Sequence, residues 1–466
     1  MKIMIVMKFG GTSVQDAAAI KQAAEIVAGR VERSPIVVVS AMACVTDALL
    51  GIAGTARERR FDEVKSAVHA LRERHLATAR ELLPEGSQVT EGCSLDEVEG
   101  GIQSLCAELE VLALSVATLG ELTPRSQDAI ASFGERLSSL IVTAAFRARG
   151  IQAEMADSRA FIVTDSRFTS AAPLMPETES RAREILLPAI ESGRVVVTQG
   201  FIGSTSDGVT TTLGRGGSDY TAAIIGAALS AETIEIWTDV DGLMTVDPRV
   251  IPEARRIRVI SFAEAAELSY FGAKVLHPST VLPAVERRIP VRIYNTHNPS
   301  CEGTLIVAQP QPSRHLIKAI AFKRGVTIVN ITSTRMLMAY GFLRTIFEVF
   351  DHHRTSVDVV TTSEVSVSIT LDHTERLEAI KRDLSGKGEV TVERGKAIVC
   401  VVGDNLKFTP GVAARLFRAI ETTNVNMISQ GASEINLTFV IDESDVDRVV
   451  RSLHDEFFSE EDALGK

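Results

Sequence analysis

Residues 1–300 alternate short runs rich in valine and isoleucine with amphipathic helical stretches. Each apolar run is bounded by Gly, Pro, Ser or Asp, which is typical of buried strands. The predicted strands are Ile3–Met7, Ile36–Val39, Arg194–Gln199, Thr233–Thr238 and Val291–Tyr294. Alternation of strands with helices indicates an α/β fold with a mostly parallel sheet between helices, in which ligands bind where strands end and helices begin.

The first helix is predicted over Val14–Ala28, because Ile20, Ala24 and Val27 fall on one helical face. Ser13, followed by Asp16 three residues later, is predicted to cap its first turn.

The sequence pattern changes at residue 309, where a proline-containing segment begins. The segment Gln309-Pro-Gln-Pro-Ser313 predicts an extended linker, because alternating prolines favour extended backbone. Beyond it, an ungapped comparison of the chain with itself at one constant offset pairs Ile328-Val329 with Ile398-Val399, Gly341 with Gly411, Phe347 with Phe417, Ser363-Glu364 with Ser433-Glu434 and Asp372 with Asp442. Unless these matches are due to chance, they predict two small α+β modules of one fold. The expected domains are 1–308, a linker at 309–315, and modules at 316–386 and 387–466.

The net charge and the cysteine pattern exclude several classes of protein. Lys and Arg total 49 against 60 Asp and Glu, and a net charge of −11 disfavours a protein that binds nucleic-acid backbones. The five cysteines are scattered without a CxxC motif, which indicates reduced thiols rather than a disulfide framework or a zinc site. No signal peptide is evident, and no apolar run approaches the roughly 18 to 20 residues that cross a bilayer. We therefore expect a cytoplasmic protein with neither nucleic acid nor a membrane as partner.

The first motif that carries chemistry is Lys8-Phe-Gly-Gly-Thr-Ser13, which follows the first predicted strand. Gly10 and Gly11 allow backbone N–H groups to approach an anion, and the helix N-terminus and Lys8 add positive charge. The spacing differs from that of a Walker A loop. A tight glycine turn that binds nothing is the alternative.

A second glycine-rich segment, Leu213-Gly-Arg-Gly-Gly-Ser-Asp219, precedes the predicted helix Tyr220–Leu229. The fork of Arg215 suits a planar carboxylate, and Asp219 adds a carboxylate at the helix start. A surface loop capped by Asp219 is the alternative. Two such turns in one α/β domain favour phosphoryl transfer, because a moving phosphate needs positive groups on each side.

Two further segments contain candidate nucleotide ligands. Thr238 and Asp239 end a predicted strand and could receive a nucleoside, although a plain polar turn is equally common. Lys274 precedes His277-Pro278, and a solvated lysine is its alternative role. His277 is interpreted as a turn residue, because phosphorylating an ionised carboxylate requires positioning and charge neutralisation rather than a base.

Taken together, these motifs resemble the amino-acid kinase family, and within it the aspartate kinases. The resemblance runs nearly end to end and rests on Lys8–Ser13, Val39–Thr46, Phe133–Arg136, Leu213–Asp219, Trp237–Asp239, Asp247–Arg249 and Phe271–His277. The two C-terminal modules resemble a pair of ferredoxin-like ACT domains, which agrees with the internal duplication.

The resemblance implies transfer of the γ-phosphate of ATP to the β-carboxylate of L-aspartate, giving 4-phospho-L-aspartate for lysine, threonine and methionine biosynthesis. Lys8 and Asp219 would be catalytic, and Mg²⁺ would bridge the ATP phosphates without a resident metal site. The implied substrate-binding residues are Ser40, Thr46, Glu135, Arg215 and Ser218. The implied ATP-binding residues are Lys8, Gly10, Gly11, Thr238, Asp239, Met244, Arg249 and Lys274.

ACT domains further imply feedback inhibition by an amino acid and a homodimer or homotetramer. The implied effector-binding residues are Met336, Ala339, Gly341, Phe342, Leu343, Ser356, Val357, Asp358, Ser363 and Glu364. The carboxylates of Asp358 and Glu364 suit the cationic side chain of lysine better than threonine, which needs hydroxyl partners. A solvated acidic face is the alternative.

Three positions depart from the family pattern. Cys44 replaces a usual glycine, so the loop after Ser40 is expected to bend differently and to expose a thiol. Met244 stands where tyrosine often lies beside the nucleotide, and Ala339 replaces a serine hydroxyl in the effector segment. Two other functions compete with the first: an amino-acid sensor without turnover, which the presence of Lys8, Arg215 and Asp219 disfavours, and a kinase acting on glutamate or another acidic metabolite.

Overall fold

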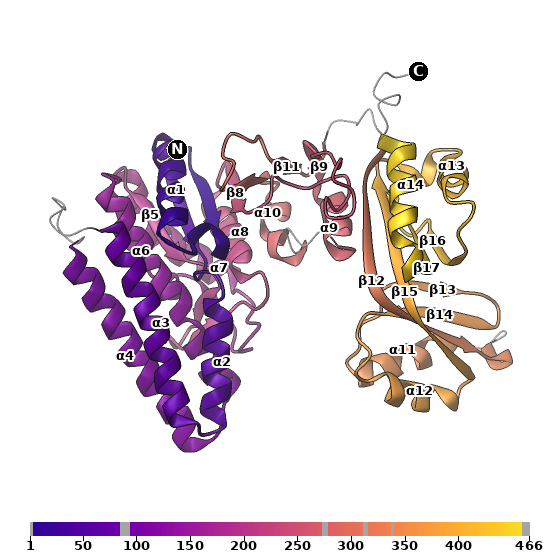
Figure 1. Cartoon of the computed structure of the whole chain (residues 1–466), viewed down its shortest axis with the longest axis horizontal. Coiled ribbons are helices and arrows are strands. Elements are labelled where there is room, and N and C mark those ends of the chain that lie inside the picture. Colours follow the sequence, from indigo (N-terminus) through magenta and orange to yellow (C-terminus); the bar gives the residue numbers. More distant parts are fainter. Residues whose placement is uncertain (1–2, 84–93, 273–277, 311–315, 337–339, 459–466) are drawn as a thin grey trace. The chain divides into compact units, whose positions relative to one another are not determined.

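The computed structural model describes residues 3–83, 94–272, 278–310, 316–336 and 340–458. The chain divides into two compact units, each drawn in Figure 1. The N-terminal unit comprises Met1–Leu243, Arg258–Phe262 and Val275–Ala308, and the C-terminal unit comprises Met244–Ile257, Ala263–Lys274 and Gln309–Lys466.

The N-terminal unit is built on an eight-stranded sheet with the order β3-β5-β2-β1-β8-β10-β11-β9. Its strands are β1 (Ile5–Phe9), β2 (Pro35–Val39), β3 (Ala153–Ala156), β5 (Val195–Gln199), β8 (Thr233–Thr238), β9 (Val259–Ser261), β10 (Val291–Asn295) and β11 (Thr304–Val307). The five predicted strands are confirmed as β1, β2, β5, β8 and β10, which are neighbours and pair in parallel. Within this sheet β10 and β11 pair antiparallel, so the sheet is mostly parallel, as predicted.

Helices cover the sheet on both faces. They are α1 (Ala17–Ala28), α2 (Val45–Arg57), α3 (Phe61–Leu82), α4 (Leu95–Leu119), α5 (Pro124–Ala131), α6 (Phe133–Ala148), α7 (Met175–Glu191), α8 (Gly217–Leu229) and α10 (Leu282–Glu286). Alternate residues of β1, such as Met7 and Phe9, join the core with Ile20 of α1 and Phe146 of α6. Helices α7 and α8 pack together and against other strand residues. A small sheet of β4 (Val163–Thr164), β6 (Ile202–Thr205) and β7 (Thr210–Thr212) completes the unit.

The start of α1 differs from the prediction. The helix begins at Ala17, and the Asp16 carboxylate accepts a hydrogen bond from the Ala19 N–H at 2.9 Å, so Asp16 rather than Ser13 is its cap. Ser13 is buried in the preceding 3₁₀ turn, where its hydroxyl lies 2.7 Å from that of Thr296. A 3₁₀ turn, Gly11–Val14, therefore lies between Gly10 and the start of α1.

The C-terminal unit contains a six-stranded antiparallel sheet with the order β13-β14-β12-β15-β17-β16. Its strands are β12 (Ile317–Thr332), β13 (Val360–Thr362), β14 (Ser366–Leu371), β15 (Glu389–Gly403), β16 (Val425–Gln430) and β17 (Asn436–Asp442). Its helices are α11 (Phe342–His352), α12 (Leu377–Ser385), α13 (Val412–Ala419) and α14 (Val446–Phe458), and it includes most of α9 (Phe262–Tyr270).

The internal duplication is visible in the backbone. Gly341 and Gly411 precede α11 and α13 with φ angles of 77° and 84°, a conformation that glycine adopts without steric cost. A second glycine pair at the same spacing, Gly325 and Gly395, has φ angles of 73° and 69° and lies where the pairing of β12 with β15 shifts register. Two modules of one α+β fold are therefore present.

The two modules are nested rather than consecutive. Val329 and Ile331 of β12 pack with α11 and α12 in one core, which we call the inner module (326–394). Ile317 and Ile320 of the same strand pack with α14 in a second core, the outer module (316–323 and 396–458). The expected boundary between 386 and 387 thus does not coincide with the division between the cores. Because β12 and β15 pair along nearly their whole length, each strand contributes one half to each module.

Two helical stretches among the described residues are long and apolar enough to cross a membrane by length and composition, namely Leu95–Leu119 and Pro124–Ala148. No such run was expected from the sequence. The most apolar part of the second stretch is 83% buried, whereas that of the first is 33% buried, with Ile102 and Leu109 in the core of the N-terminal unit. Core helices often pass this test, so it is weak evidence for a membrane span. Cys44, Cys106, Cys301 and Cys400 form no disulfide within the part of the chain that the structure describes.

Candidate active site

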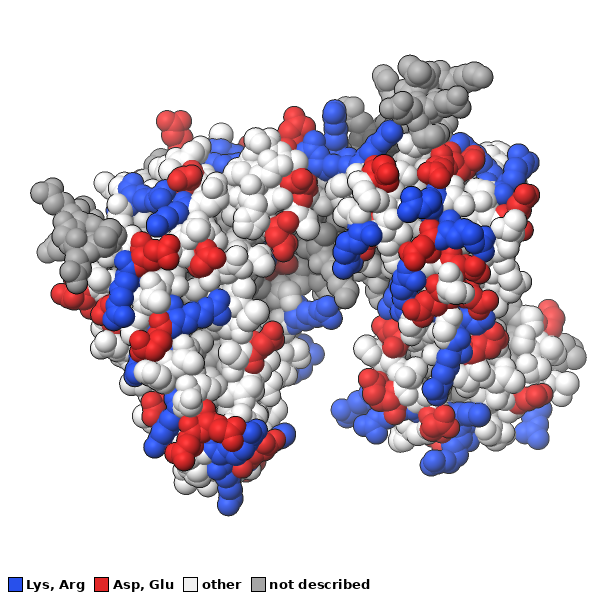
Figure 2. Space-filling model, viewed as in Figure 1, with Lys and Arg blue, Asp and Glu red and all other residues white. Residues whose placement is uncertain are grey.

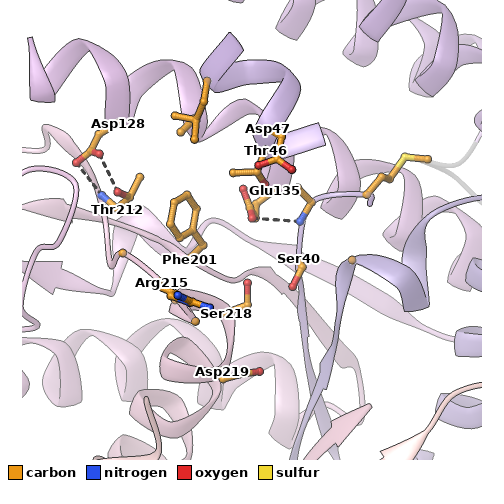
Figure 3. Close-up of a pocket in the computed structure, with 18 of the residues that line it drawn as sticks. Ser40, Thr46, Asp47, Asp128, Glu135, Phe201, Thr212, Arg215, Ser218 and Asp219 are labelled. Carbon is orange, nitrogen blue, oxygen red and sulfur yellow. Dashed lines mark hydrogen bonds between the residues drawn. The ribbon is translucent and has the colours of Figure 1, made fainter. Parts of the chain in front are cut away.

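A cavity of about 620 Å³ lies in the N-terminal unit where β1 and β2 end and α2 and α8 begin. Three segments supply most of its lining: residues 40–47 after β2, residues 212–219 around the start of α8, and one face of α5 and α6. Lys8, Gly11, Thr169 and Phe201 also line it. Figure 3 shows side chains from all three segments around the cavity. Ligand sites of open α/β sheets are expected at the carboxyl ends of neighbouring strands, and this cavity has that location.

The two glycine-rich turns meet at this cavity. Lys8 Nζ lies 2.7 Å from Asp219 Oδ1, and the two side chains are only 11% and 13% exposed. A Cβ atom at Gly11 would lie 3.0 Å from the carbonyl oxygen of Ala41, so this turn packs closely against the segment after β2. Gly214 and Gly216 bend the second turn with φ angles of 77° and 71°. The structure therefore brings together the residues that the sequence assigned to phosphate transfer.

Glu135 presents a buried carboxylate to the same cavity. Its Oε1 accepts a hydrogen bond from the Ala41 N–H at 3.1 Å, whereas its buried Oε2 has no hydrogen-bond partner among the described residues. Burial raises the pKa of Glu135 to about 8, because a carboxylate loses hydration inside the protein. An oxygen in this state is suited to receive a cationic group of a ligand.

The other predicted substrate residues also line the cavity. Ser40 and Thr46 flank it after β2, and Arg215 and Ser218 lie on the second glycine turn (Figure 3). Arg215 is exposed, and no carboxylate of the described residues pairs with its guanidinium. Among its described lining residues, the cavity thus offers a free cation, a carboxylate oxygen without a donor and several hydroxyl groups.

Cys44 occupies an unusual conformation at the entrance to α2. Its φ angle is 64°, in the left-handed region that favours glycine, and it is the N-cap residue of the helix. The cysteine thus adopts a glycine-like backbone conformation at a cost of roughly 1 to 2 kcal/mol, and a different bend of the loop relative to the family stays a prediction. Its exposed thiol lies at the cavity, as expected.

Several lining residues were not identified from the sequence, most notably Asp128, Phe201 and Thr212. Asp128 lies on α5, is fully buried and contacts Thr169 and Thr212, which are 41 and 84 residues away in the chain. No local pattern marks such a residue, because its partners are defined only by the fold.

The predicted nucleotide residues fall into three groups. Thr238 ends β8 and Asp239 follows it. The parallel pairing of β8 with β1 brings Trp237 opposite Phe9, beside the first glycine turn. The Gly10 N–H donates to the Trp237 carbonyl at 3.0 Å, which fixes that turn against β8. Met244 and Arg249 belong to the C-terminal unit. Lys274 lies outside the described residues.

Arg249 and Met244 are held locally within the C-terminal unit. The Arg249 guanidinium is 86% exposed and binds Asp247 at 2.6 Å, and this contact lowers the pKa of the aspartate carboxyl. Met244 is partly buried and forms a β-bridge with Arg256.

The predicted effector residues lie in the inner module around the start of α11 and the strands β13 and β14. Gly341 caps α11, Phe342 and Leu343 form its first turn, and Met336 ends the preceding 3₁₀ turn. Ser356, Val357 and Asp358 precede β13, and Ser363 and Glu364 form the turn between β13 and β14. Ala339 lies outside the described residues.

Asp358, one of the two predicted partners of a cationic effector, is engaged by neighbouring side chains. Its carboxylate accepts a hydrogen bond from the Tyr270 hydroxyl of α9, and its second oxygen lies 3.2 Å from Lys323 Nζ. Lys323 also pairs with Asp372 at 2.7 Å. Burial and the neighbouring Asp358 raise the pKa of Tyr270. Glu364, in contrast, is exposed.

Among the described residues, neither the surface charge in Figure 2 nor the potential metal ligands indicate a second functional site. On the face shown in Figure 2, acidic and basic side chains of the described residues are interspersed rather than gathered in a basic stripe. Within residues 3–83, 94–272, 278–310, 316–336 and 340–458, no three His, Cys, Asp or Glu side chains gather as a protein-only metal site.

Comparison with known proteins gives consistent matches. Residues 4–295 match the amino acid kinase family, and residues 399–457 match an ACT domain. The chain is 39% identical to lysine-sensitive aspartokinase 3 of Escherichia coli over 98% of its own length and 100% of that protein. It is 36% identical to the chloroplastic aspartokinase 1 of Arabidopsis thaliana over 99% of its own length and 81% of that protein.

Solved structures agree with these sequence matches. A crystal structure of Escherichia coli aspartokinase III with aspartate and ADP superposes with a TM-score of 0.82 at 38% identity, covering 98% of this chain and 100% of that one. The same enzyme with lysine and aspartate superposes with a TM-score of 0.81 at 39% identity, again covering 98% and 100%. The fold, the cavity and these matches agree, and the chain belongs to the amino acid kinase family, within its aspartokinase branch.

Proposed function

We propose that this protein transfers the γ-phosphate of ATP to the β-carboxylate of L-aspartate and so forms 4-phospho-L-aspartate. The observation that carries the proposal is the cavity in which the Lys8–Asp219 pair, Arg215 and Glu135 converge. Aspartate carries two carboxylates and one ammonium group, and this set supplies a partner for each. The aspartokinases to which the chain is similar support the same reaction.

Each group has a distinct task in binding the substrate. The fork of Arg215 receives the α-carboxylate through two parallel hydrogen bonds. Oε2 of Glu135, which lacks a donor within the described residues, receives the ammonium group. The hydroxyl groups of Ser40, Thr46 and Ser218 complete the lining, and the β-carboxylate is thereby directed toward Lys8.

Transfer itself then requires alignment and charge neutralisation. A β-carboxylate oxygen attacks the γ-phosphorus, the bond to the bridging oxygen of ADP breaks, and no proton has to be removed from the ionised nucleophile. Lys8 stabilises the negative charge on the transferred group, supported by backbone N–H groups of the Gly10-Gly11 turn. When the phosphates arrive, they compete with Asp219 for Lys8.

The nucleotide is proposed to occupy the carboxyl ends of β1 and β8, with Thr238 and Asp239 beside it. For Met244, Arg249 and Lys274, a role in nucleotide binding is proposed on the family resemblance alone. Magnesium that arrives with ATP takes most of its ligands from phosphate and water and needs only one or two carboxylates, a demand that Asp219 beside Lys8 fits. Bound there, Mg²⁺ would neutralise phosphate charge.

The activity is tested by trapping the acyl phosphate with hydroxylamine in the presence of MgATP and aspartate. We expect a coloured hydroxamate with aspartate, little with glutamate because of its extra methylene, and none with asparagine, which lacks the second carboxylate. Preferential turnover of glutamate would support the second candidate, a kinase for another acidic metabolite. Binding of aspartate without any turnover would support the sensor.

For regulation, we propose that lysine binds the inner module and inhibits the kinase. The exposed Glu364 and the nearby Ser363 offer partners for an amino acid, and a relative named lysine-sensitive supports this choice over threonine. Because Asp358 is already engaged by Tyr270 and Lys323, a cationic ligand has to compete for it. Threonine inhibition without lysine inhibition would reverse the assignment.

We further propose a cytoplasmic homodimer or homotetramer assembled through the ACT modules. Sedimentation of the full chain, with and without lysine, measures the assembly directly. A monomer at micromolar concentration under both conditions would contradict it.

A further inference from the structure

Asp128 combines complete burial with hydrogen bonds from two distant segments. The Thr169 N–H lies 2.9 Å from its Oδ2 and 3.1 Å from its Oδ1. Thr212 donates twice, from its N–H to Oδ2 at 2.9 Å and from its hydroxyl to Oδ1 at 2.7 Å. The dashed lines in Figure 3 mark the contacts with Thr212. Both carboxylate oxygens are therefore engaged by the protein itself.

The two segments that Asp128 holds both fix the turn that carries Arg215. Thr212 is the last residue of β7, and the glycine-rich turn begins at the next residue. The Thr169 carbonyl lies 3.2 Å from the position of a Cβ on Gly214, so it packs against the same turn. The Ala171 N–H also donates to the Thr212 carbonyl at 2.9 Å. Asp128 thus anchors the entry of the turn, whereas α8 anchors its exit.

Asp128 and Glu135 both line the cavity, but their hydrogen bonding separates their tasks. Glu135 has a buried oxygen without a donor among the described residues, which is ready for a ligand. Asp128 accepts three N–H or O–H donors, and these contacts act against the rise that burial causes in its pKa. A carboxylate that is already satisfied by the backbone around it is suited to hold that backbone rather than to bind substrate.

We infer that Asp128 is a positioning residue that holds the Arg215 turn in the geometry required to bind the α-carboxylate of the substrate. The inference rests on the proposed function and adds a residue to which neither the sequence motifs nor the comparisons assign a role. Displacing a substrate clamp by about 1 Å can cost on the order of 100-fold in activity, so the effect is measurable.

The first test is Asp128→Asn in the full-length enzyme. The Asn side chain presents an N–H group to the donors of Thr169 and Thr212, which need an acceptor. The turn that carries Arg215 should therefore shift. We expect the KM for aspartate to rise roughly 10- to 100-fold, as for other residues that orient a binding group, with the KM for ATP unchanged within about twofold. Asp157→Asn, which removes a carboxylate that caps a turn away from the cavity lining, is the matched control.

A double-mutant cycle with Arg215→Ala distinguishes positioning from direct contact. If Asp128 acts through Arg215, Asp128→Asn raises the KM for aspartate only slightly once Arg215 is absent. Equal effects in both backgrounds would overturn the inference, as would an unchanged aspartate KM in the single variant. Wild-type enzyme that makes no hydroxamate from aspartate would instead contradict the proposed function itself.

Thr212→Val tests the same inference in case Asp128→Asn does not fold. It removes the hydroxyl donor and keeps the Thr212 N–H bond, so a smaller rise of roughly threefold to tenfold in the aspartate KM is expected for the loss of one hydrogen bond of ordinary strength. Thermal unfolding of each variant reports whether the fold is retained. A folded Thr212→Val enzyme with wild-type KM for aspartate would contradict the role of this contact.

Discussion

Lys8 Nζ and Asp219 Oδ1 form an ion pair at 2.7 Å in the cavity lining, and the two residues come from different glycine-rich segments. The cation that the proposed reaction needs is therefore paired with a carboxylate that the same reaction needs nearby. The ion pair holds both turns at the spacing into which substrate and ATP must fit. Lys8 and Asp219 should therefore contribute differently to the rate of phosphate transfer.

Replacing Lys8 with alanine should lower kcat by roughly 100- to 1000-fold, the usual loss for one group that stabilises developing charge. Lys8→Arg should retain part of the activity, because the charge persists while its position changes. Lys21→Ala, at a partly exposed lysine of α1, is the surface control. Hydroxamate formation under saturating MgATP and aspartate gives the measurement. Lys8→Ala with near wild-type kcat would remove Lys8 from the transfer step.

Aspartate binding should release protons near pH 7. The pKa of Glu135 is raised to about 8 by burial, so the carboxyl group is mostly protonated there in the free enzyme. The substrate ammonium favours the charged form and lowers this pKa, so the proton leaves on binding. Aspartate affinity should therefore rise as the pH increases from about 6 to 8. Titration calorimetry in two buffers with different ionisation enthalpies counts the protons.

The control for this prediction is Glu135→Gln. The amide cannot titrate, so the variant should bind aspartate more weakly and with no proton release assignable to this site. If the wild type and the variant release the same number of protons, another group is responsible.

His75 should make the N-terminal unit less stable at acidic pH. It is fully buried on α3, and burial lowers its pKa to about 4 from the usual 6.5. Between these values the unfolded chain binds a proton that the folded chain does not, so stability falls as the pH decreases from 6.5 to 4. The loss reaches about 3 kcal/mol at most, at 1.36 kcal/mol for each pH unit.

Urea midpoints measured across this pH range test the prediction. His75→Gln should flatten the pH dependence even if it lowers the midpoint overall. His69→Gln, at an exposed histidine of the same helix, should leave it unchanged. A pH profile of His75→Gln parallel to the wild type would exclude this histidine as the source.

Removing the hydroxyl of Tyr270 should make the enzyme more sensitive to lysine. In the wild type Asp358 accepts a hydrogen bond from Tyr270, and an incoming ammonium group must displace it. Tyr270→Phe frees that oxygen, so half-inhibition should occur at a lysine concentration about fivefold to tenfold lower, which corresponds to roughly 1 kcal/mol for one hydrogen bond. Inhibition curves at fixed substrate concentrations give the values.

Ser269→Ala, on the same helix but bonded to Ala265, should leave lysine inhibition unchanged. Asp358→Ala should weaken inhibition and spare catalysis. Retained lysine sensitivity in Asp358→Ala would move the effector site elsewhere, whereas unchanged sensitivity in Tyr270→Phe alone would show only that Tyr270 does not compete with the ligand.

Much of the N-terminal unit could be predicted because its signals are local. Buried parallel strands appear as continuous apolar runs, and Gly10-Gly11 and Gly214 to Gly217 mark the turns between strand and helix. Glu135 and Arg215 were assigned from the family resemblance, and the fold brings them to one cavity. Asp128 was missed because its partners are 41 and 84 residues away, beyond the range of any periodic pattern.

The arrangement of the two C-terminal modules could not be predicted from the repeat alone. A constant offset between the copies is compatible with consecutive and with nested modules, since both have the same linear order of elements. The pairing of β12 with β15 decides between them, and it depends on contacts between segments far apart in the chain. Likewise, nothing around Asp358 in the sequence indicated that Tyr270 would occupy its carboxylate.

The division of the chain has a consequence for any attempt to dissect it. The polypeptide passes between the two units at 243/244, 257/258, 262/263, 274/275 and 308/309. Val246 and Ile251, from a segment before the linker, are each 2% exposed in the core of the outer module. Truncation at residue 309 would remove the outer module that packs against these side chains and expose them to water. We therefore expect a kinase shortened at the linker to be prone to aggregate.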